Sequence, residues 1–253
     1  MDSDILNIKV VFLTLDIGNS KTKWGLFEYD NLISRGVFLN TSKTPEFWNS
    51  AGITDIVYSA SGKIGDPLKD FINNQPHALN LGNIPLPFLS LYETPDTLGR
   101  DRVAAIKGAS VKFTNTDLLV IDAGSCLTFD FIDQNGIHMG GTISPGIKMR
   151  LKAVNAFTDK LPLLSEIPNA IEPLAKNTSS AIGQGALLGF LYETEGYISY
   201  VKSHFPKLKI LVTGGDAWIF VKFIKIKIFA EPNLVLMGLN EILKNYVEKK
   251  GWN

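Results

Sequence analysis

The chain has 253 residues, of which 45% are hydrophobic and 20% charged, and its 25 Lys and Arg residues balance its 25 Asp and Glu residues. This length is large for a single hydrophobic core and comfortable for two domains. Because the charges balance, the chain offers no basic footprint for a polyanion, and the composition argues against nucleic acid as its main partner.

The amino terminus lacks the features of a targeting segment. Asp2 and Asp4 stand where a secretory signal carries basic residues, and Asp16 ends the first apolar run well short of a membrane span. Cys126 is the only cysteine, which excludes an internal disulfide and is typical of reducing compartments. We therefore expect a cytoplasmic protein without a signal peptide or a transmembrane helix.

The first predicted element is a β-hairpin. The apolar run Val10–Leu15 indicates a buried strand, Ile17–Lys21 a tight turn, and Lys23–Phe27 the returning strand. Asp16 therefore ends a strand, and Gly18 lies in the turn that follows it. Glycine lets backbone N–H groups approach a ligand closely, and successive turn amides form an anion-binding nest. A carboxylate beside such a nest suits a site for phosphate and a cation.

Strands and helices alternate downstream of this hairpin. The apolar patterns predict a strand over Asn31–Phe38, a short helix over Pro45–Ser50, a strand over Ile56–Tyr58, a helix over Asp66–Asn73, and loop with short strand over Leu79–Leu91. Asp101 and Arg102 begin a further amphipathic helix, where the dipole and free N–H groups favour anions. A surface ion pair is the commoner explanation of this pair. The functional alternative is a base for a hydroxyl group and an arginine for an anionic group on the same substrate.

The hairpin recurs in the second half of the chain. Leu118–Ile121 predicts a strand, Ala123–Cys126 a turn and Leu127–Ile132 a returning strand, so Asp122 and Gly124 match the acid and the glycine of the first copy. Two hairpins with Asx turns would explain either copy alone. The repetition favours two related half-domains that close on one nucleotide. Their boundary is expected near residues 110–117.

The remaining elements follow the order of the first half. The predictions are a strand over Gly136–Ile143, a helix with Ser144 as N-cap and Pro145 at its first position, a helix over Asn177–Tyr192 capped by residues 178–180, a strand over Lys209–Thr213 that leads into a Gly-Gly-Asp turn, a strand-like segment over Val221–Phe229, and a carboxy-terminal helix over Leu234–Tyr246. Glycines at 183, 185 and 189 in the long helix predict close packing or the approach of another backbone.

Other reactive residue types carry little signal. The histidines, His77, His138 and His204, are far apart and have no ligand partner at metal-binding spacing, so we expect ordinary surface or half-buried residues and no zinc site. Cys126 is better explained as a small packing residue than as a nucleophile, because no histidine lies near it in sequence. Lys21 and Lys23 are either solvated turn lysines or neutralise a transferred phosphoryl group.

Several motifs in order give the chain a family resemblance. It resembles the type III pantothenate kinases, within the superfamily of acetate and sugar kinases, heat-shock ATPases and actin. The resemblance spans nearly the whole chain and rests on DIGNSKTK at 16–23, Tyr92 followed by GRDR at 99–102, DAGSCLTFD at 122–130, GGTISPG at 140–146, TSSAIGQG at 178–185 and TGGDA at 213–217. It implies an α/β fold of two ribonuclease-H-like domains, each a mixed sheet flanked by helices, at residues 1–112 and 113–253, in a homodimer.

The same resemblance implies an activity and a set of site residues. The reaction is transfer of the γ-phosphate of Mg-ATP to the primary hydroxyl of pantothenate, giving 4'-phosphopantothenate for coenzyme A synthesis. The implied phosphate cradle is Asp16, Ile17, Gly18, Asn19, Ser20, Lys21, Thr22 and Lys23, with Ser125 also contacting ATP. The implied pantothenate site is Tyr92, Gly99, Arg100, Asp101, Arg102 and Thr178, with Asp101 as proton acceptor, and Asp122 holds a monovalent cation, potassium or ammonium.

Two positions depart from the family pattern. Ser125 stands where threonine is usual, which keeps the hydroxyl group, and Arg100 stands where a small residue is commoner. Two alternatives remain: a kinase for another small hydroxyl substrate on the same fold, and a non-catalytic regulator that binds nucleotide. Retention of Asp16, Asp101 and Asp122 favours catalysis, because a degenerate site has no reason to keep all three acids.

Overall fold

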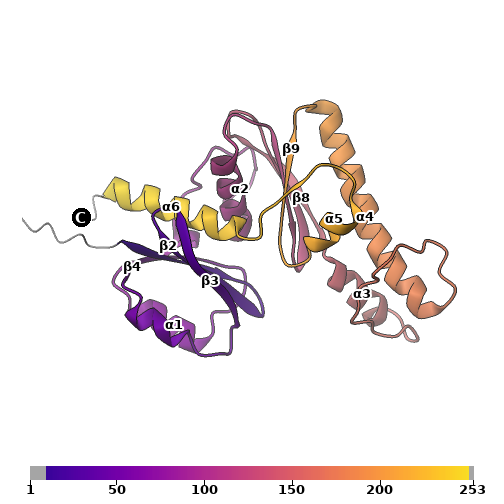
Figure 1. The fold of residues 1–253 in the computed structure, drawn as a ribbon, viewed down its shortest axis with the longest axis horizontal. Coiled ribbons are helices and arrows are strands. Elements are labelled where there is room, and N and C mark those ends of the chain that lie inside the picture. Colours follow the sequence, from indigo (N-terminus) through magenta and orange to yellow (C-terminus); the bar gives the residue numbers. More distant parts are fainter. Residues whose placement is uncertain (1–9, 251–253) are drawn as a thin grey trace, which may run out of the picture. The chain divides into compact units, whose positions relative to one another are not determined.

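A computed structural model describes residues 10–250, which form two compact α/β units (Figure 1). The first unit comprises residues 10–89, 93–112 and 233–250 of the described chain, and the second comprises residues 90–92 and 113–232. The carboxy-terminal helix, which the sequence-based division grouped with residues 113–253, therefore packs in the first unit. No helix among the described residues is long and apolar enough to cross a membrane.

The first unit contains a mixed five-stranded sheet in the order β3-β2-β1-β4-β5. β1, β2 and β3 are antiparallel neighbours, whereas β4 and β5 run parallel to β1. Its elements are β1 (Val11–Ile17), β2 (Lys21–Glu28), β3 (Asn31–Leu39), β4 (Ile53–Ala60), β5 (Ala78–Asn80), α1 (Asp66–Asn73), α2 (Arg100–Lys112), α6 (Leu234–Lys250), and the short 3₁₀ helices at Glu46–Ser50, Leu81–Asn83 and Pro95–Thr97.

Helices cover both faces of this sheet (Figure 1). On one face, Leu68 and Ile72 of α1 pack with Leu13, Leu15 and Ile17 of β1 in one hydrophobic core. On the other face, α6 lies against β1 and β4, and α2 packs along α6. Both faces are covered by apolar side chains, since Leu234, Leu239 and Leu243 of α6 are at most 1% exposed.

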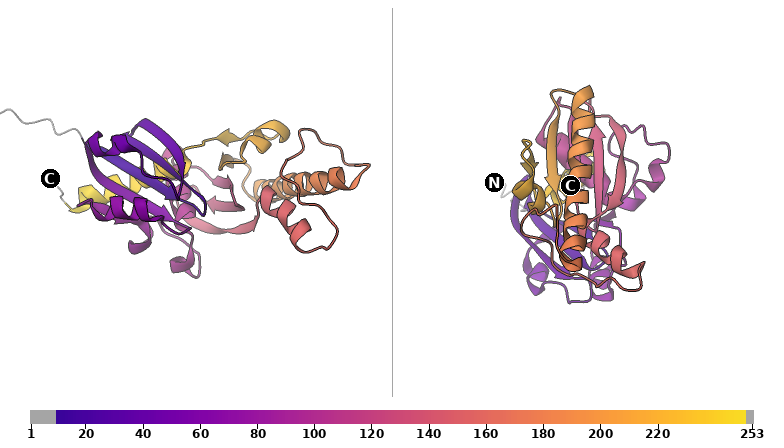
Figure 2. Two further views of the ribbon diagram at one scale, coloured as in Figure 1. Left: turned by 90° about the horizontal axis from the view of Figure 1, so that it is seen from below. Right: turned by 90° about the vertical axis from the view of Figure 1, so that its right-hand side faces the viewer.

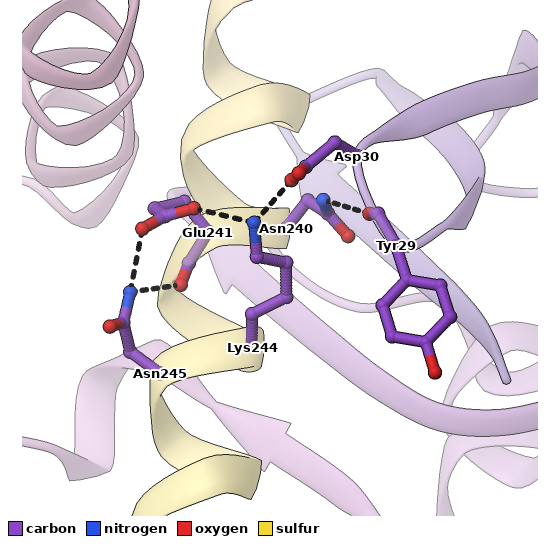
Figure 3. A network of polar contacts seen from close by, with 6 residues as sticks. All are labelled: Tyr29, Asp30, Asn240, Glu241, Lys244 and Asn245. Carbon is purple, nitrogen blue, oxygen red and sulfur yellow. Dashed lines mark hydrogen bonds and ion pairs between the residues drawn. The ribbon is translucent and has the colours of Figure 1, made fainter.

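Polar contacts fix α6 to the tip of the β2–β3 hairpin (Figure 3). The Asn240 side chain donates to the backbone oxygen of Tyr29 at 2.7 Å, and Tyr29 adopts a positive φ of 52°. Lys244 donates to Asp30 and, at 3.0 Å, pairs with Glu241. Although partial burial lowers the pKa of Lys244, its hydrogen bonds to Asp30 and Glu241 outweigh that effect and raise the pKa above 10.5. Lys244 is therefore charged at neutral pH.

The second unit repeats the arrangement of the first. Its sheet has the order β10-β9-β6-β7-β8, in which β6, β7 and β8 are antiparallel and β9 and β10 run parallel to β6. The long helix α4 lies along one face of the sheet (Figure 2). The elements are β6 (Leu118–Ala123), β7 (Cys126–Ile132), β8 (His138–Pro145), α3 (Ile147–Ala156), α4 (Thr178–His204), β9 (Lys209–Thr213), α5 (Trp218–Phe223) and β10 (Phe229–Ala230).

The structure corrects several local predictions. Ser144 and Pro145 end β8, and Gly146 is the N-cap of the helix that follows. The segment predicted as strand-like over Val221–Phe229 contains the end of α5 and only the start of β10. These errors share a cause: in each case residues at an element boundary satisfy two patterns, and packing against the core decides between them.

Two predictions about α4 also need correction. Asn177 caps the helix by accepting from the Ser180 N–H at 2.9 Å, in place of the predicted group at residues 178–180. Gly183 packs closely against Pro168, as expected, whereas a Cβ at Gly189 would only reach ordinary contact with the end of the Arg150 side chain at 3.4 Å. At Gly185 no described atom outside the backbone of the helix itself lies within 4 Å of a Cβ. Close packing therefore explains one of the three glycines.

Candidate active site

The strand register of the first unit aligns three polar residues on one face of the sheet. Asp16 near the end of β1 pairs with Lys23 of β2 on one side and with Ser59 of β4 on the other. Paired residues of neighbouring strands project to the same face, so the three side chains form a row. The Ser59 hydroxyl donates to Asp16 Oδ1 at 3.2 Å. Ser59 was not among the residues singled out from the sequence.

The environment of Asp16 disfavours the ionised form of its carboxyl. Removal from water raises the pKa of this carboxyl above the ordinary value of 3.8, and the negative charge of Asp101 adds to this effect. The positive charge of Lys23 and the hydrogen bond from Ser59 act in the opposite direction without cancelling it. The structure thus brings Asp16, Lys23 and Asp101 within electrostatic reach of one another, although they are far apart in sequence. Two acids beside one lysine favour a bound cation.

The turn after β1 is braced from two sides. The Asn40 side chain donates to the Gly18 oxygen at 2.7 Å and accepts from the Thr22 hydroxyl at 2.8 Å. On the other side, a Cβ at Gly62 would lie 2.5 Å from the Gly18 oxygen, so only glycine permits this approach. Neither Asn40 nor Gly62 was predicted as a site residue, because both lie outside the motif at 16–23.

The braced turn exposes the groups that an anion needs. Asn19, Ser20 and Lys21 are exposed, and the N–H groups of Asn19 and Ser20 donate to no acceptor among the described residues. Free turn amides of this kind bind phosphate oxygens. The side chains of Ile17 and Thr22, by contrast, are fully buried. These two residues can serve a phosphate cradle only by holding the backbone in place.

The first turn of α2 holds Asp101 in a defined position. Its Oδ1 accepts from the Arg102 N–H at 2.8 Å, and a Cβ at Gly99 would lie only 2.7 Å from the same oxygen. A larger residue at position 99 would therefore displace the Asp101 carboxylate from this position. Arg102 is buried, at 6% exposure. Arg100 places its Nη1 atom in a buried position with no hydrogen-bond acceptor among the described residues.

The second unit braces its own turn in the same way. A Cβ at Gly214, after β9, would lie 2.4 Å from Asp122 Oδ1, and Gly214 has a φ of +95°. A Cβ at Gly146, after β8, would lie 2.5 Å from the Ser125 oxygen, whose partner is the Gly146 N–H at 3.1 Å. Ser125 itself is exposed. The predicted Gly-Gly-Asp turn thus meets the second hairpin at the carboxyl ends of β6 and β9, the usual ligand edge of such sheets.

Two further predicted residues lie in the second unit. Thr178 is exposed at the first position of α4. Tyr92 belongs to the short segment Ser90–Tyr92, which docks beside β8: Ser90 bridges to His138, and the Leu91 N–H donates to the His138 oxygen at 2.8 Å. His138 is completely buried and bonded to Asp130 at 2.9 Å. The prediction that all histidines are surface or half-buried was therefore wrong for His138.

The acids of the described chain do not form a protein-only metal cage, since no group of three or more His, Cys, Asp or Glu residues gathers among them. Mg²⁺ normally enters such sites with one or two carboxylates and the substrate phosphates, and retains several waters. Asp16 offers one carboxylate for such an ion, and the exposed amides of the Gly18 turn can bind the phosphates that accompany it. The residues present are thus compatible with Mg-ATP.

Known proteins resemble this chain over most of its length. A model of the type III pantothenate kinase family matches residues 12–200. The type III pantothenate kinase of Phocaeicola vulgatus is 37% identical over 235 residues, which cover 91% of this chain and 97% of the relative.

Solved structures share the fold at lower identity. A Campylobacter jejuni protein described as belonging to the Baf family of transcriptional activators has a TM-score of 0.62 at 23% identity, covering 93% of this chain and 99% of its own. The activator of 2-hydroxyisocaproyl-CoA dehydratase from Clostridium difficile, with bound ADPNP, has a TM-score of 0.53 at 11% identity, covering 95% and 97%. With the duplicated sheets, these similarities confirm the expected fold class.

Proposed function

The chain belongs to the type III pantothenate kinase family, and we propose that it transfers the γ-phosphate of ATP to the primary hydroxyl of pantothenate. The product is 4'-phosphopantothenate, and the step opens coenzyme A synthesis. One observation in the structure supports this most strongly: Asp16, Lys23 and Ser59 form a row beside an exposed turn, within the electrostatic reach of Asp101. This set offers an anion nest, two acids and a lysine, which are the groups that phosphoryl transfer uses.

The first unit would supply the base and the phosphate contacts. Asp101 accepts the proton of the pantothenate hydroxyl while the hydroxyl oxygen attacks the γ-phosphorus of ATP. The bond between the γ-phosphorus and the β,γ-bridging oxygen breaks, and ADP leaves. The position of Asp101 in the first turn of α2 is fixed by the Arg102 N–H. Lys23 and the turn amides stabilise the charge that develops on the phosphoryl oxygens. Positioning provides much of the rate, because phosphoryl transfer demands little covalent chemistry from the protein.

Cations complete the charge balance in this proposal. Asp16, beside the Gly18 turn, would hold the Mg²⁺ that enters with ATP, and the ion would neutralise phosphate charge when bound. In the second unit, Asp122 would hold the monovalent cation, potassium or ammonium, and Ser125 would contact ATP. The support for these roles is the braced turn, in which Gly214 lies against Asp122 and Gly146 lies against Ser125.

The remaining parts of the proposal concern the acceptor and the assembly. Tyr92, Gly99, Arg100, Arg102 and Thr178 would contact pantothenate, and Arg102 is suited to its carboxylate because guanidinium groups bind carboxylates in a bidentate manner. We also propose that the protein acts in the cytoplasm as a homodimer. The single cysteine supports the first statement, and family membership supports the second.

A coupled assay for ADP release tests the reaction directly. We expect turnover that requires pantothenate and is faster in potassium than in sodium. Asp101→Asn should lower kcat by at least about a hundredfold, since general bases contribute about 10²–10⁴ in rate. Asp96→Asn is the matched control, because Asp96 is an exposed acid just before the same helix.

Two results would contradict the proposal. Turnover in folded wild-type protein that is independent of pantothenate, with a different hydroxyl compound as acceptor, would assign another kinase activity. Wild-type rates in Asp101→Asn would remove the base from its assigned role while leaving the reaction itself intact.

A further inference from the structure

A buried polar chain in the second unit has no part in the roles proposed above. It joins Asp130 in β7, His138 at the start of β8, and Ser90. His138 and Asp130 are 0% and 2% exposed. His138 Nε2 lies 2.9 Å from Asp130 Oδ1, and His138 Nδ1 lies 2.8 Å from the Ser90 hydroxyl. The Ser90 oxygen in turn accepts from the backbone N–H of Tyr92 at 3.1 Å.

A β-bulge makes this chain possible. Phe131 pairs with Gly140, but the next residue, Ile132, pairs with His138, so Met139 is the extra residue. Gly140 has a φ of +121°, which few other residues adopt. A shift of one residue exchanges the two faces of a strand. Without the bulge, His138 would face the opposite side of the sheet from Asp130.

The hydrogen bonds of this chain can all be satisfied in one direction. An ionised carboxylate only accepts, so Nε2 of His138 carries a proton and donates to Asp130. In that tautomer Nδ1 accepts from the Ser90 hydroxyl, whose oxygen in turn accepts from the Tyr92 N–H. Buried networks in which every member is satisfied fix a single arrangement of their residues. The chain therefore ends in a defined position for Tyr92.

Two independent contacts link Tyr92 to the same buried histidine. Its backbone N–H is held by the Ser90 hydroxyl. Its ring stacks on the His138 ring, with an angle of 25° between the ring planes and 6.1 Å between the centroids. The docking of Leu91 on the His138 oxygen adds a third attachment for the segment. Residues on both sides of Ser90–Tyr92 belong to the first unit, so this short segment is secured in the second unit by these contacts.

We propose that Asp130, His138 and Ser90 are positioning residues that fix Tyr92 for binding of the acceptor substrate. The inference rests on the proposed function, because it takes Tyr92 as a contact of pantothenate. A positioning role differs from a purely structural one in what it affects. Loss of the hydrogen bonds between Asp130, His138 and Ser90 should raise the KM for pantothenate selectively. A general loss of stability would instead change the KM values for ATP and pantothenate alike.

Steady-state kinetics of Ser90→Ala with each substrate varied in turn can separate these roles. We expect the KM for pantothenate to rise about five- to tenfold, the effect of losing one or two hydrogen bonds. The KM for ATP and kcat should stay within about twofold of wild type, since no phosphate contact changes. Ser90→Thr keeps the hydroxyl and should restore the KM for pantothenate. Ser203→Ala is the control, as Ser203 is an exposed serine of α4 whose hydroxyl donates to the Tyr200 oxygen.

Hydrogen exchange at the Tyr92 amide gives a readout that is independent of activity. Exchange should be faster in Ser90→Ala than in wild type or Ser203→Ala. Equal exchange in folded Ser90→Ala, or an unchanged KM for pantothenate, would overturn the positioning role. So would a parallel rise in both KM values. Wild-type protein that fails to phosphorylate pantothenate would instead overturn the proposed function, a result that the wild-type assay identifies before any variant is compared.

Discussion

Asp16 shows how a functional residue can oppose stability. Burial and the nearby Asp101 raise the pKa of its carboxyl above 3.8, so the folded protein binds this proton more tightly than the unfolded chain does. The stability contributed by the protonated form is present at low pH. It is lost as the pH rises from 3.8 through the raised pKa, and at neutral pH the ionised carboxylate is destabilising. A bound cation would offset this cost.

Replacing Asp16 with asparagine should therefore stabilise the protein without ligands. Asparagine preserves the shape and a partner for Ser59 but cannot be ionised. We expect a higher Tm than wild type at pH 7, by about 2–4 °C for each kcal/mol of relief, together with loss of kinase activity. The gain should grow from pH 4 to neutral pH, following the ionisation of the wild-type carboxyl. Calorimetry across this range measures it, and a Tm equal to or below wild type at every pH would contradict the prediction.

Substitution of Asp122 tests whether this residue binds the monovalent cation. If its carboxylate holds potassium, Asp122→Ala should remove the difference in rate between potassium and sodium in the ADP-release assay. Asp159→Ala, which changes an exposed acid in the loop after α3, should retain that difference. Persistent stimulation by potassium in the Asp122 variant would place the cation elsewhere. The ratio of the two rates is the quantity to compare, because it does not depend on protein concentration.

Site residues that belong to a recurring sequence motif could be predicted, whereas residues that reach the site only through the tertiary fold could not. Asp16 and Asp122 were identifiable because each ends an apolar run and precedes a glycine turn. Asn40 and Ser59 gave no such signal, since their contacts depend on strand pairing over 20 or more residues. His138 was misjudged because the one-residue shift of a bulge, which Gly140 permits, decides the face to which its side chain points.

The packing of α6 on α2 depends on two glycines. A Cβ at Gly238 would lie 1.8 Å from the Ala104 oxygen, and a Cβ at Gly108 would lie 2.4 Å from the Leu234 oxygen. The backbones of the two helices thus approach more closely than any side chain allows. This contact holds α2, and α2 carries Asp101 in its first turn. The spacing of α2 from α6 consequently matters for the site as well as for stability.

Gly238→Ala should lower the free energy of unfolding by about 3 kcal/mol or more, because the obstructing atom is backbone and the helices must separate. Gly196→Ala is the matched control: no described atom lies within 4 Å of a Cβ there, and α4 is exposed at that position. It should gain about 0.5–1 kcal/mol from helix propensity. Urea denaturation measures both values. A neutral Gly238→Ala would mean that the two helices are not in contact at this point.

Elements with one strong pattern were predictable to their ends, as with the helix Asp66–Asn73 and the strand Lys209–Thr213. Segments with mixed patterns were not. Val221–Phe229 alternates charged and apolar residues as a strand does, yet Ile219 and Phe220, just before it, are buried in the core through α5. Local alternation cannot reveal such a competing contact.

For the molecule as a whole, the duplication was visible in the sequence, but the division of the chain between the two units was not. Both sheets have the same strand order, and in both the turn after the first strand is braced by the residues that follow the third and fourth strands. The first unit, however, is completed only by α6, after the entire second unit has been traversed. The amphipathic pattern of a terminal helix shows which of its faces is buried but not which domain it packs against.

Truncation after Pro232 should thus unfold the first unit selectively. Six apolar side chains of α6 are at most 4% exposed: Leu234, Val235, Leu236, Leu239, Ile242 and Leu243. Burial of each contributes about 1.5–3 kcal/mol, and the sum is comparable to the total stability of a domain, about 5–15 kcal/mol. Hydrogen exchange should show β1, β2 and β4 unprotected, while β6, β7 and β9 keep their protection. Protected strands in the first unit would show that α6 is dispensable. Loss of protection in both sheets would show that the two units fold as one cooperative body, against the division inferred from their separate cores.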